Sequence, residues 1–289
     1  MIPKVDGSRE AVREFVWKTQ RVGKTVGVVM TMGALHDGHL SLVEACNAEC
    51  DATIVTIFVN PTQFGPTEDL EKYPRQLEAD VESLSALSVD MIFTPAVEQM
   101  YGPNHSTNVQ PPAVSGPLEG VCRPGHFAGV ATIVLKLLNV IPANVAFFGS
   151  KDYQQLQVIR AMVRDLDVCT KIVGCPIVRD SDGLAMSSRN AYMTGDERNQ
   201  ALSLSKGLNA AVATFGQGER DASTLAEKIR QQLVEAGIKK IDYVTVANPE
   251  TLEPAVNADE NSIALIAAYV GKTRLIDNRR LGDGPIVSS

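Results

Sequence analysis

Residues 25–40 read TVGVVMTMGALHDGHL, and this stretch decides the fold class. Residues 25–31 are mostly β-branched and apolar, which is typical of a strand buried on both faces of a parallel sheet. The residues after His36 have helical spacing, so a helix is expected over 38–50. A strand that passes through a short turn into a helix favours an α/β protein.

The same alternation of strand-like and helix-like stretches continues through the first two thirds of the chain. Phe127, Val130 and Val134, for example, recur at the spacing of an amphipathic helix. Strands are expected over 52–59, 90–94 and 144–148, and helices over 74–87, 127–141 and 152–166. This order predicts a Rossmann-like, mostly parallel sheet with helices on both faces.

The pattern changes in the last third of the chain. A capping box at Thr194–Glu197 predicts the start of one helix, and Thr224–Glu227 predicts the start of another that stops at Gly237. Three strand-like stretches follow, at 241–246, 263–270 and 273–276. Residues 1–177 are therefore expected to form the Rossmann-like domain, and residues 178–289 a smaller α+β domain.

Composition narrows the class of protein. The chain has 289 residues, with 27 Lys and Arg against 34 Asp and Glu, which gives a net charge of −7. This acidic balance argues against a protein built to hold nucleic acid, which normally has a basic face. No apolar run approaches the about 18 residues of a membrane span, and the N-terminus shows no secretory signal pattern. The five cysteines lack CxxC spacing, which favours reduced thiols in the cytoplasm over a disulfide scaffold.

His36 and His39 lie where the first predicted strand gives way to the first helix, in the order His-Asp-Gly-His. Ligands of parallel α/β sheets bind at the carboxyl ends of strands, and helix N-termini favour phosphate. Two imidazoles can donate N–H groups to a phosphoryl group there, and Gly38 allows a nucleotide to approach the backbone. Two alternatives stay open: one histidine caps the helix while the other is on the surface, or the His-x-x-His spacing binds zinc.

Two further loops suit a nucleotide. Gly149–Asp152 follows a predicted strand, and its lysine offers a positive charge to phosphates. The hydroxyls and the guanidinium of Ala185–Asn190 form a candidate clamp for β- and γ-phosphates. An ordinary capped turn is the alternative for the first loop, and a polar linker between domains is the alternative for the second.

Together, the His-Asp-Gly-His turn and the later Met-Ser-Ser-Arg resemble the HIGH/KMSKS nucleotidyltransferases, which activate substrates by attack on the α-phosphate of ATP. Neither a Walker loop nor a GxGxxG fingerprint is present. A more specific resemblance, to the pantothenate synthetase family, rests on six blocks in the family's order. These blocks are 31–39 (TMGALHDGH), 58–65 (FVNPTQFG), 69–75 (DLEKYPR), 123–127 (RPGHF), 148–155 (FGSKDYQQ) and 183–190 (GLAMSSRN).

The resemblance implies an AMP-forming ligase that condenses (R)-pantoate with β-alanine through a bound pantoyl adenylate, on the route to coenzyme A. It also implies Mg²⁺ and a homodimer, with no residue assigned as a metal ligand. In such an enzyme His39 is the catalytic proton donor, His36 assists at the phosphates, and Gln63 and Gln155 hold pantoate. The implied ATP site consists of Met32, Gly33, Ala34, Leu35, His36, Asp37, Gly38, His39, Gly149, Ser150, Lys151, Asp152, Val178, Met186, Ser187, Ser188 and Arg189.

Two positions depart from the family pattern: Ser150 stands where Glu is usual, and Ala128 replaces a longer, often basic residue. Two other functions stay open, a nucleotidyltransferase that releases a stable adenylate and a nucleotide-binding regulator without catalysis. His126 either faces the site or only opens a helix. The loop over 60–73 is the segment expected to close over the adenylate.

Overall fold

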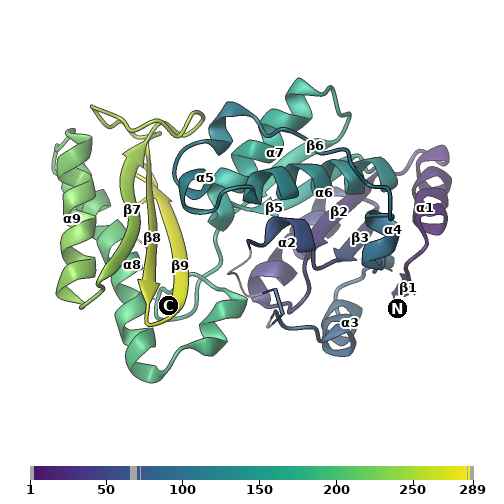
Figure 1. Ribbon diagram of the computed structural model, residues 1–289, viewed down its shortest axis with the longest axis horizontal. Coiled ribbons are helices and arrows are strands. Elements are labelled where there is room, and N and C mark those ends of the chain that lie inside the picture. Colours follow the sequence, from purple (N-terminus) through teal and green to yellow (C-terminus); the bar gives the residue numbers. More distant parts are fainter. Residues whose placement is uncertain (1–2, 66–69, 72, 285, 287–289) are drawn as a thin grey trace. The chain divides into compact units, whose positions relative to one another are not determined.

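A computed structural model describes residues 3–65, 70–71, 73–284 and 286 of the chain (Figure 1). By their internal contacts these residues divide into two compact units. Unit 1 comprises Met1–Ser150 and Gln155–Pro176, and unit 2 comprises Lys151–Gln154 and Ile177–Ser289. The domain boundary expected between residues 177 and 178 stays a prediction.

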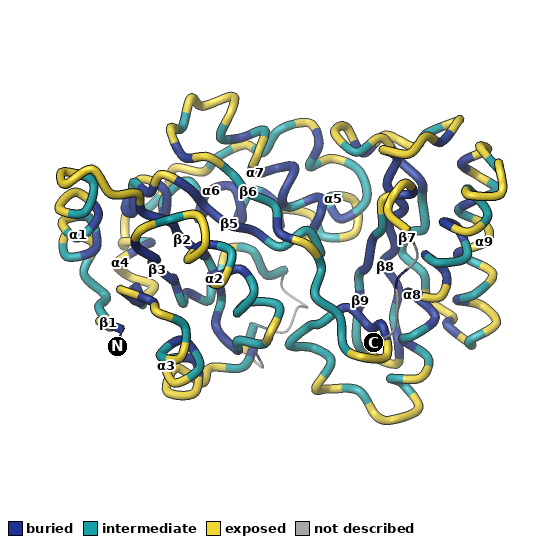
Figure 2. The backbone as a smooth tube through the Cα atoms, turned by 180° about the vertical axis from the view of Figure 1, so that it is seen from behind, coloured by how far each residue is buried: buried dark blue, intermediate teal, exposed yellow. Residues whose placement is uncertain are grey.

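Unit 1 is built on a six-stranded sheet in the order β1-β4-β3-β2-β5-β6, and every pairing in it is parallel. The central strands are buried along most of their length (Figure 2). Their residues are apolar at successive positions, as expected for strands covered on both faces. The predicted parallel sheet is confirmed. The strands are β1 (Lys4–Asp6), β2 (Val26–Thr31), β3 (Ala52–Ile57), β4 (Met91–Phe93), β5 (Val145–Gly149) and β6 (Lys171–Cys175).

Helices cover this sheet and complete its core. One core cluster joins Val29 and Phe147 of the sheet to apolar side chains of α2 and α3, while α1 and α6 contact each other. The α-helices are α1 (Arg9–Arg21), α2 (Asp37–Glu49), α3 (Leu77–Ser85), α4 (Val97–Met100), α5 (Glu119–Cys122), α6 (His126–Val140) and α7 (Tyr153–Asp165). Short 3₁₀ turns are η1 (Pro61–Gln63), η2 (Ala113–Ser115) and η3 (Ser150–Asp152).

The strand order places a topological switch point between β2 and β5. From β2 the chain runs outward through β3 and β4, whereas β5 pairs on the other side of β2 and continues to β6. Ligands of open α/β sheets bind outside the carboxyl ends of the strands at such a point. The two strands end at Thr31 and Gly149, so two of the predicted nucleotide loops leave the sheet from neighbouring strands.

Unit 2 pairs two helices with a three-stranded antiparallel sheet in the order β7-β8-β9. Its core lies between the sheet and the helices, and it includes Leu204, Leu225 and Ile266. The antiparallel arrangement confirms the predicted smaller α+β part of the fold class. Its elements are α8 (Gly195–Gly216), α9 (Ala222–Glu235), β7 (Lys240–Ala247), β8 (Ile263–Val270), β9 (Thr273–Arg280) and the 3₁₀ turn η4 (Ser188–Tyr192).

The helix ends of unit 2 follow from local hydrogen bonds. Thr194 and Glu197 form the predicted capping box of α8, with bonds of 2.9 and 3.3 Å. The predicted start of α9 at Thr224 is wrong, because the Asp221 carboxylate caps the helix and accepts the Thr224 amide at 2.6 Å. Gly237, at a φ of +83°, follows the end of α9 as predicted.

Two general properties complete the fold. No helix among the described residues has the length and apolarity that crossing a bilayer requires. All the cysteines are free thiols. Cys46 and Cys50 pack together at the start of β2, and burial raises the pKa of Cys46 to about 12. A thiol with that pKa stays protonated at neutral pH and acts as a core side chain.

Candidate active site

The turn after β2 is held in an unusual backbone conformation. Gly33 and Ala34 have φ angles of +80° and +51°, a region that costs a residue with a Cβ atom. A buried carboxylate offsets that cost. Asp80 of α3, which is 1% exposed, accepts the amide of Ala34 at 3.1 Å and that of Leu35 at 2.8 Å.

Asp80 is a residue that sequence analysis missed. It lies one helical turn before Leu84 on the buried face of α3, so it is a carboxylate at a core position. A buried carboxylate needs hydrogen-bond donors, and backbone amides of a strained turn supply them. The charged residue on an apolar helix face was therefore the available signal. Asp80 fixes the backbone of the Met32–His39 segment. This segment contains most of the unit 1 residues that the family resemblance implies for ATP binding.

The two histidines cap α2 together. His36 is the N-cap residue, and its Nδ1 accepts the Gly38 amide at 3.1 Å. His39 Nδ1 in turn accepts the His36 amide at 3.4 Å, and the ring centroids are 4.1 Å apart. This arrangement is a reciprocal capping box built from imidazoles. His36 therefore caps the helix, as the first alternative had it. His39 is half-buried beside it and is not an isolated surface residue.

These capping bonds set the tautomer of both rings. An imidazole nitrogen that accepts a hydrogen bond carries no proton, so the neutral forms of His36 and His39 carry theirs on Nε2. Each ring therefore presents an Nε2–H donor at the N-terminal end of α2, where backbone amides and the helix dipole already favour an anion. Among the described residues no group of three or more potential ligands is arranged to hold a metal ion.

Gln63 is fixed by two neighbours at the end of η1. Its Nε2 donates to Met32 Sδ at 2.7 Å, and its Oε1 accepts from Asn60 Nδ2 at 3.1 Å. Asn60 is 1% exposed and also donates to the Gly129 carbonyl at 3.2 Å. The structure thus brings the residue implied for pantoate into contact with Met32, the first residue implied for ATP.

Helix α6 also supports η1, the turn that carries Gln63. His126, its first residue, accepts from Arg123 Nη1 through Nε2 at 3.0 Å, which leaves the proton on Nδ1. That Nδ1 donates to the Gln63 carbonyl at 2.8 Å. His126 therefore opens a helix and also anchors the backbone of Gln63. Ala128, which departs from the family pattern, lies half-buried in the first turn of the same helix.

Gly129 allows α6 to approach η1 closely, which makes Gly129→Ala informative. A Cβ at residue 129 would lie 2.3 Å from the Thr62 carbonyl oxygen, so backbone has to move. We expect a loss of about 1–3 kcal/mol in the free energy of unfolding, together with a raised KM for pantoate. Denaturant unfolding and steady-state kinetics measure both effects.

Gly216→Ala is the matched control for this prediction. Gly216 is also helical, but a Cβ there meets nothing within 4 Å. This variant is expected to be neutral or more stable by up to about 1 kcal/mol, because alanine has the higher helix propensity. Unchanged stability and unchanged pantoate KM in Gly129→Ala would contradict the packing described for α6.

In unit 2 a folded-back loop joins two residues implied for the ATP site. The Met186 amide donates to the Val178 carbonyl at 3.0 Å, and Arg179 pairs with Ala185 in an antiparallel bridge. Arg198 of α8 holds the tip of this loop through Asp180 and Asp182, with contacts of 2.7 and 2.8 Å. The loop is therefore a built element and not the loose linker that the sequence left open.

The Met-Ser-Ser-Arg segment ends in the 3₁₀ turn η4. Ser187 is its N-cap, and its Oγ accepts the Arg189 amide at 3.3 Å. Asn190 donates to the Ala185 carbonyl at 3.1 Å, which ties the two ends of the segment. Ser187, Ser188 and Arg189 are all half-buried.

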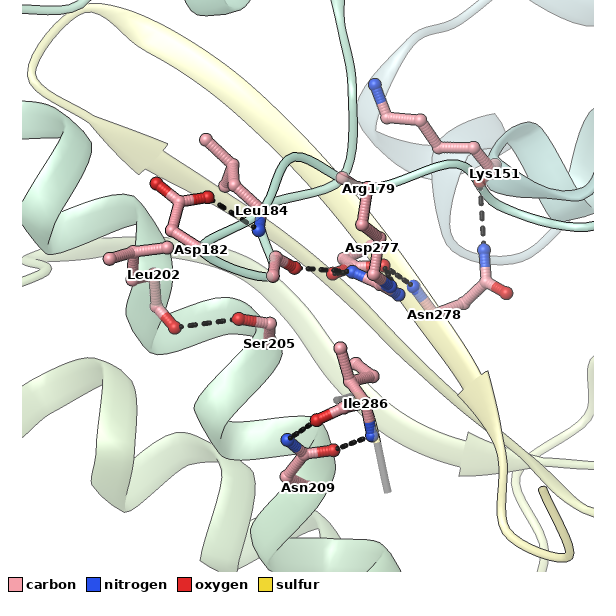
Figure 3. Close-up of polar contacts among 12 residues, drawn as sticks. Lys151, Arg179, Asp182, Leu184, Leu202, Ser205, Asn209, Asp277, Asn278 and Ile286 are labelled. Atoms are coloured by element: carbon pink, nitrogen blue, oxygen red, sulfur yellow. Dashed lines mark hydrogen bonds and ion pairs between the residues drawn. The ribbon is translucent and has the colours of Figure 1, made fainter. Parts of the chain in front are cut away.

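Lys151 is attached to β9 through its backbone. Its carbonyl accepts Asn278 Nδ2 at 2.9 Å, and its side chain extends away from that bond (Figure 3). Next to Asn278, Asp277 receives both terminal nitrogens of Arg179, at 2.7 and 2.8 Å. Sequence analysis gave Arg179, Asp277 and Asn278 no role. The strand expected over 273–276 in fact extends to Arg280 and carries two of them.

The charges around Lys151 favour a polyanion. Desolvation lowers the pKa of Lys151; Asp152 and Asp277 oppose that shift, whereas Arg189 and Arg179 add to it. The residue as a whole keeps intermediate exposure, so solvent reaches part of it. A phosphate chain bound near Lys151 would add negative charge that favours its protonated form.

The structure also gives the positions of the other residues that the family resemblance implies. Gly149 ends β5, Ser150 starts η3, Asp152 is exposed, and Gln155 lies in the first turn of α7. Of the loop over 60–73, residues 66–69 and 72 lie outside the described residues, so its expected closure stays a prediction.

A parallel sheet with hydrogen-bond donors at its switch point is typical of enzymes that bind phosphorylated nucleotides. Residues 4–280 match the family described as pantoate-beta-alanine ligase. The chain belongs to this family, and it is a ligase that forms a carbon–nitrogen bond.

Relatives and solved structures agree along nearly the whole chain. A pantothenate synthetase of Thermotoga neapolitana is 50% identical over 273 residues, which cover 94% of this chain and 98% of the relative. The crystal structure of the Thermus thermophilus enzyme superposes with a TM-score of 0.91 at 39% identity, covering 96% of this chain and 99% of that one. The Francisella tularensis pantoate-beta-alanine ligase, complexed with beta-gamma ATP and beta-alanine, has a TM-score of 0.79 at 33% identity, covering 98% and 99%.

Proposed function

We propose that this ligase activates the carboxylate of pantoate with ATP and retains the pantoyl adenylate until β-alanine attacks it. A carboxylate oxygen bonds to the α-phosphorus, and pyrophosphate leaves. The amine nitrogen then bonds to the acyl carbon, loses a proton, and AMP leaves with that oxygen. The observation that carries this proposal is the pair of Nε2–H donors at the N-terminus of α2, because charge develops on the α-phosphate in the first step.

Within this proposal the histidines differ in role. His39 Nε2–H donates to the α-phosphate or its bridging oxygen, and His36 Nε2–H assists at the neighbouring phosphates. The amides of the turn held by Asp80 add donors that need no reorganisation during the reaction. Gly38 carries no side chain, so the nucleotide approaches the backbone of α2 directly.

Unit 2 is proposed to hold the rest of the nucleotide. The pairing of Val178 with Met186 supports adenine binding by backbone groups of that loop. Lys151, Ser187, Ser188 and Arg189 are proposed to bind the β- and γ-phosphates, since two cations and two hydroxyls satisfy the leaving pyrophosphate. The remaining implied residues lie in unit 1 and are proposed to line the ATP site: Leu35 and Asp37 after β2, and Gly149 and Ser150 at the end of β5.

Pantoate is proposed to bind through Gln63 and Gln155. A primary amide offers two donors and an acceptor, which suits the hydroxyl groups of a dihydroxy acid while leaving its carboxylate nucleophilic. The amide of Gln63 is already held by Met32 and Asn60, so its orientation is set before the substrate arrives.

Gln63→Ala is expected to raise the KM for pantoate about tenfold or more, with the KM for ATP changed less than about threefold. The reason is that pantoate is the one substrate that this amide contacts in the proposed site. Initial rates with each substrate varied in turn measure the two constants. Gln231→Ala, at an exposed position on α9, is the matched control. Equal changes in both KM values would remove Gln63 from the pantoate site.

Mg²⁺ is proposed to enter with ATP. In nucleotide enzymes this ion is held mainly by substrate phosphates and water with one or two carboxylates, so no preformed cluster of protein ligands is required. Asp152 fits that role, because it is an exposed carboxylate next to Lys151. The ion would neutralise charge on the leaving pyrophosphate. A homodimer in the cytoplasm is also proposed, with support from the family resemblance and the free cysteines.

The test is AMP formation from ATP, Mg²⁺ and pantoate, with and without β-alanine. Catalytic accumulation of AMP only when β-alanine is present supports the ligase with a retained adenylate. Pyrophosphate release that does not depend on β-alanine would instead indicate an enzyme that releases a stable adenylate. ATP binding without turnover in either mixture would indicate a regulator and overturn the proposal.

A further inference from the structure

Strand β9 contains two adjacent buried polar residues, Asp277 and Asn278, whose side chains bond to different partners. Asp277 is 3% exposed and Asn278 is 5% exposed, although both follow an apolar run. Asp277 binds Arg179 through both carboxylate oxygens, and its Oδ1 also accepts the Asn278 amide at 2.8 Å. Asn278 then donates through Nδ2 to the carbonyl of Lys151 at 2.9 Å, across 127 positions in the sequence.

These hydrogen bonds link the 178–186 loop to Lys151. Arg179 also donates to the Gly183 carbonyl at 3.1 Å, so one guanidinium joins the 178–186 loop to β9. The ion pair is well shielded, with side chains 11% and 2% exposed. A bidentate pair in such a place fixes geometry more than it adds stability. Figure 3 shows Arg179 beside Asp277, and Asn278 next along β9 with its bond to Lys151.

We propose that Asn278 is a positioning residue for Lys151, and that the Arg179–Asp277 pair holds Asn278 in place for that task. The inference rests on the proposed function, in which Lys151 binds the phosphates of ATP. The bond to the Lys151 carbonyl fixes the point from which the lysine side chain starts. Arg179 donates to both oxygens of Asp277, so the direct partner of that carboxylate is the guanidinium and Asp277 acts on the Lys151 ammonium only through its charge.

Loss of this bond is expected to change the backbone conformation at Lys151 and not the packing of the core. An asparagine shortened to alanine leaves the Lys151 carbonyl without its donor, and the residue can then adopt other backbone angles. The lysine would still be present, but it would spend less time where the phosphates bind. ATP affinity is therefore expected to fall, while the KM values for pantoate and β-alanine change little.

A double-mutant cycle tests this directly. The dissociation constant for ATP alone, measured by calorimetry, is compared in the unaltered protein, Asn278→Ala, Lys151→Ala and the double variant. We expect Asn278→Ala to weaken ATP binding about tenfold in the unaltered protein and less than about twofold once Lys151 is gone. Equal factors in both backgrounds, or no weakening in either, would overturn the inference.

Matched variants separate positioning from folding. Asn209→Ala removes an asparagine of the same unit that also bonds to backbone, through the Ile286 carbonyl at 2.9 Å (Figure 3). It is expected to lower the melting temperature as much as Asn278→Ala does, with ATP affinity unchanged. Should Asn278→Ala fail to fold, Asn278→Leu keeps most of the side-chain volume, removes the donor and adds no charge, and the same loss of ATP affinity is expected.

The cycle also separates this inference from the proposed function. If Lys151→Ala binds ATP as tightly as the unaltered protein, the role of Lys151 itself is wrong. If Lys151→Ala loses affinity and Asn278→Ala does not, only the positioning role of Asn278 fails.

Discussion

His39→Asn is expected to lower the rate of adenylate formation by about 10²- to 10³-fold, with ATP still bound. Asparagine can place its carbonyl oxygen near the position of Nδ1, so it can keep the hydrogen bond to the His36 amide that caps α2. It has nothing at the position of Nε2. The variant therefore removes the donor to the α-phosphate while sparing the helix cap.

His39→Gln is the matched comparison. Its amide nitrogen reaches about the position of Nε2, so a donor is kept while the capping acceptor is lost. We expect it to retain more adenylation activity than His39→Asn and to melt at a lower temperature. His105→Ala, which removes a histidine packed on Tyr101 with ring centroids 4.9 Å apart, should keep its adenylation rate within about threefold. Pyrophosphate release in single turnovers measures these rates. A fall of less than about tenfold in a folded His39→Asn protein would contradict the role given to His39.

Lys151→Met is expected to lower kcat/KM for ATP by about 10²- to 10³-fold, because methionine keeps the apolar stem but removes the charge that faces the phosphates. Lys171→Met removes an exposed lysine that pairs with Glu49 at 2.7 Å, and it should change this constant by less than about twofold. Steady-state kinetics with ATP varied measure both. A Lys151→Met protein within about fivefold of the unaltered enzyme would exclude Lys151 from phosphate binding.

The lowered pKa of Lys151 gives this prediction a dependence on pH. Burial makes the protonated form unfavourable in the folded protein, so the pKa lies below the ordinary 10.5. As pH rises through the lowered pKa, ATP affinity should fall because the ammonium loses its proton. Over the same interval, up to the unfolded pKa, the stability of the ligand-free protein should rise relative to Lys151→Met, since the unfolded state then binds more protons.

The direction in which Lys151→Met changes the melting temperature is a separate test. Lys151→Met should melt at the same temperature as the unaltered ligand-free protein or slightly higher, because a poorly compensated cation has been removed from the site. Thermal unfolding at several pH values without nucleotide measures it. A marked fall in the melting temperature would mean that Lys151 has a structural role instead.

The sequence predicted the elements whose patterns are long and regular. The central strands β2, β3 and β5 are continuous apolar runs, and α6 repeats apolar residues at helical spacing, so their expected positions were close to those observed. β1 and β6 were not predicted, because neither is a continuous buried run: β1 has no buried residue, and Cys175 is the one buried residue of β6. α1 was missed as well, since Val12 and Val16 are its only buried residues and charged side chains fill the rest.

Some residues of the candidate site were likewise predictable from sequence, and others were not. His36, His39 and Lys151 follow strands directly, so local sequence placed them at the carboxyl ends of β2 and β5. Asp80 and Asn278 act through backbone groups 45 or 46 and 127 positions away, and no local pattern encodes such pairings. They become visible only when the fold shows a buried polar side chain and the backbone group that satisfies it.

Charged residues also concealed a strand. The pattern after Thr273 was broken by Arg274, Asp277 and Arg279, so the strand was expected to stop at Ile276. In the structure Asp277 is paired with Arg179, and its charge is compensated inside the unit. The strand therefore continues to Arg280 and carries the residue proposed to position Lys151.

The central claim is that the carboxylate of pantoate attacks the α-phosphate of ATP. Its most direct test is a reaction with pantoate labelled with ¹⁸O in both carboxylate oxygens, followed by mass spectrometry of the products. We predict one labelled oxygen in AMP and none in pyrophosphate, because the carboxylate oxygen that bonds to phosphorus leaves with AMP. Label in inorganic phosphate, with ADP as the nucleotide product, would show attack on the γ-phosphate and contradict the adenylate mechanism.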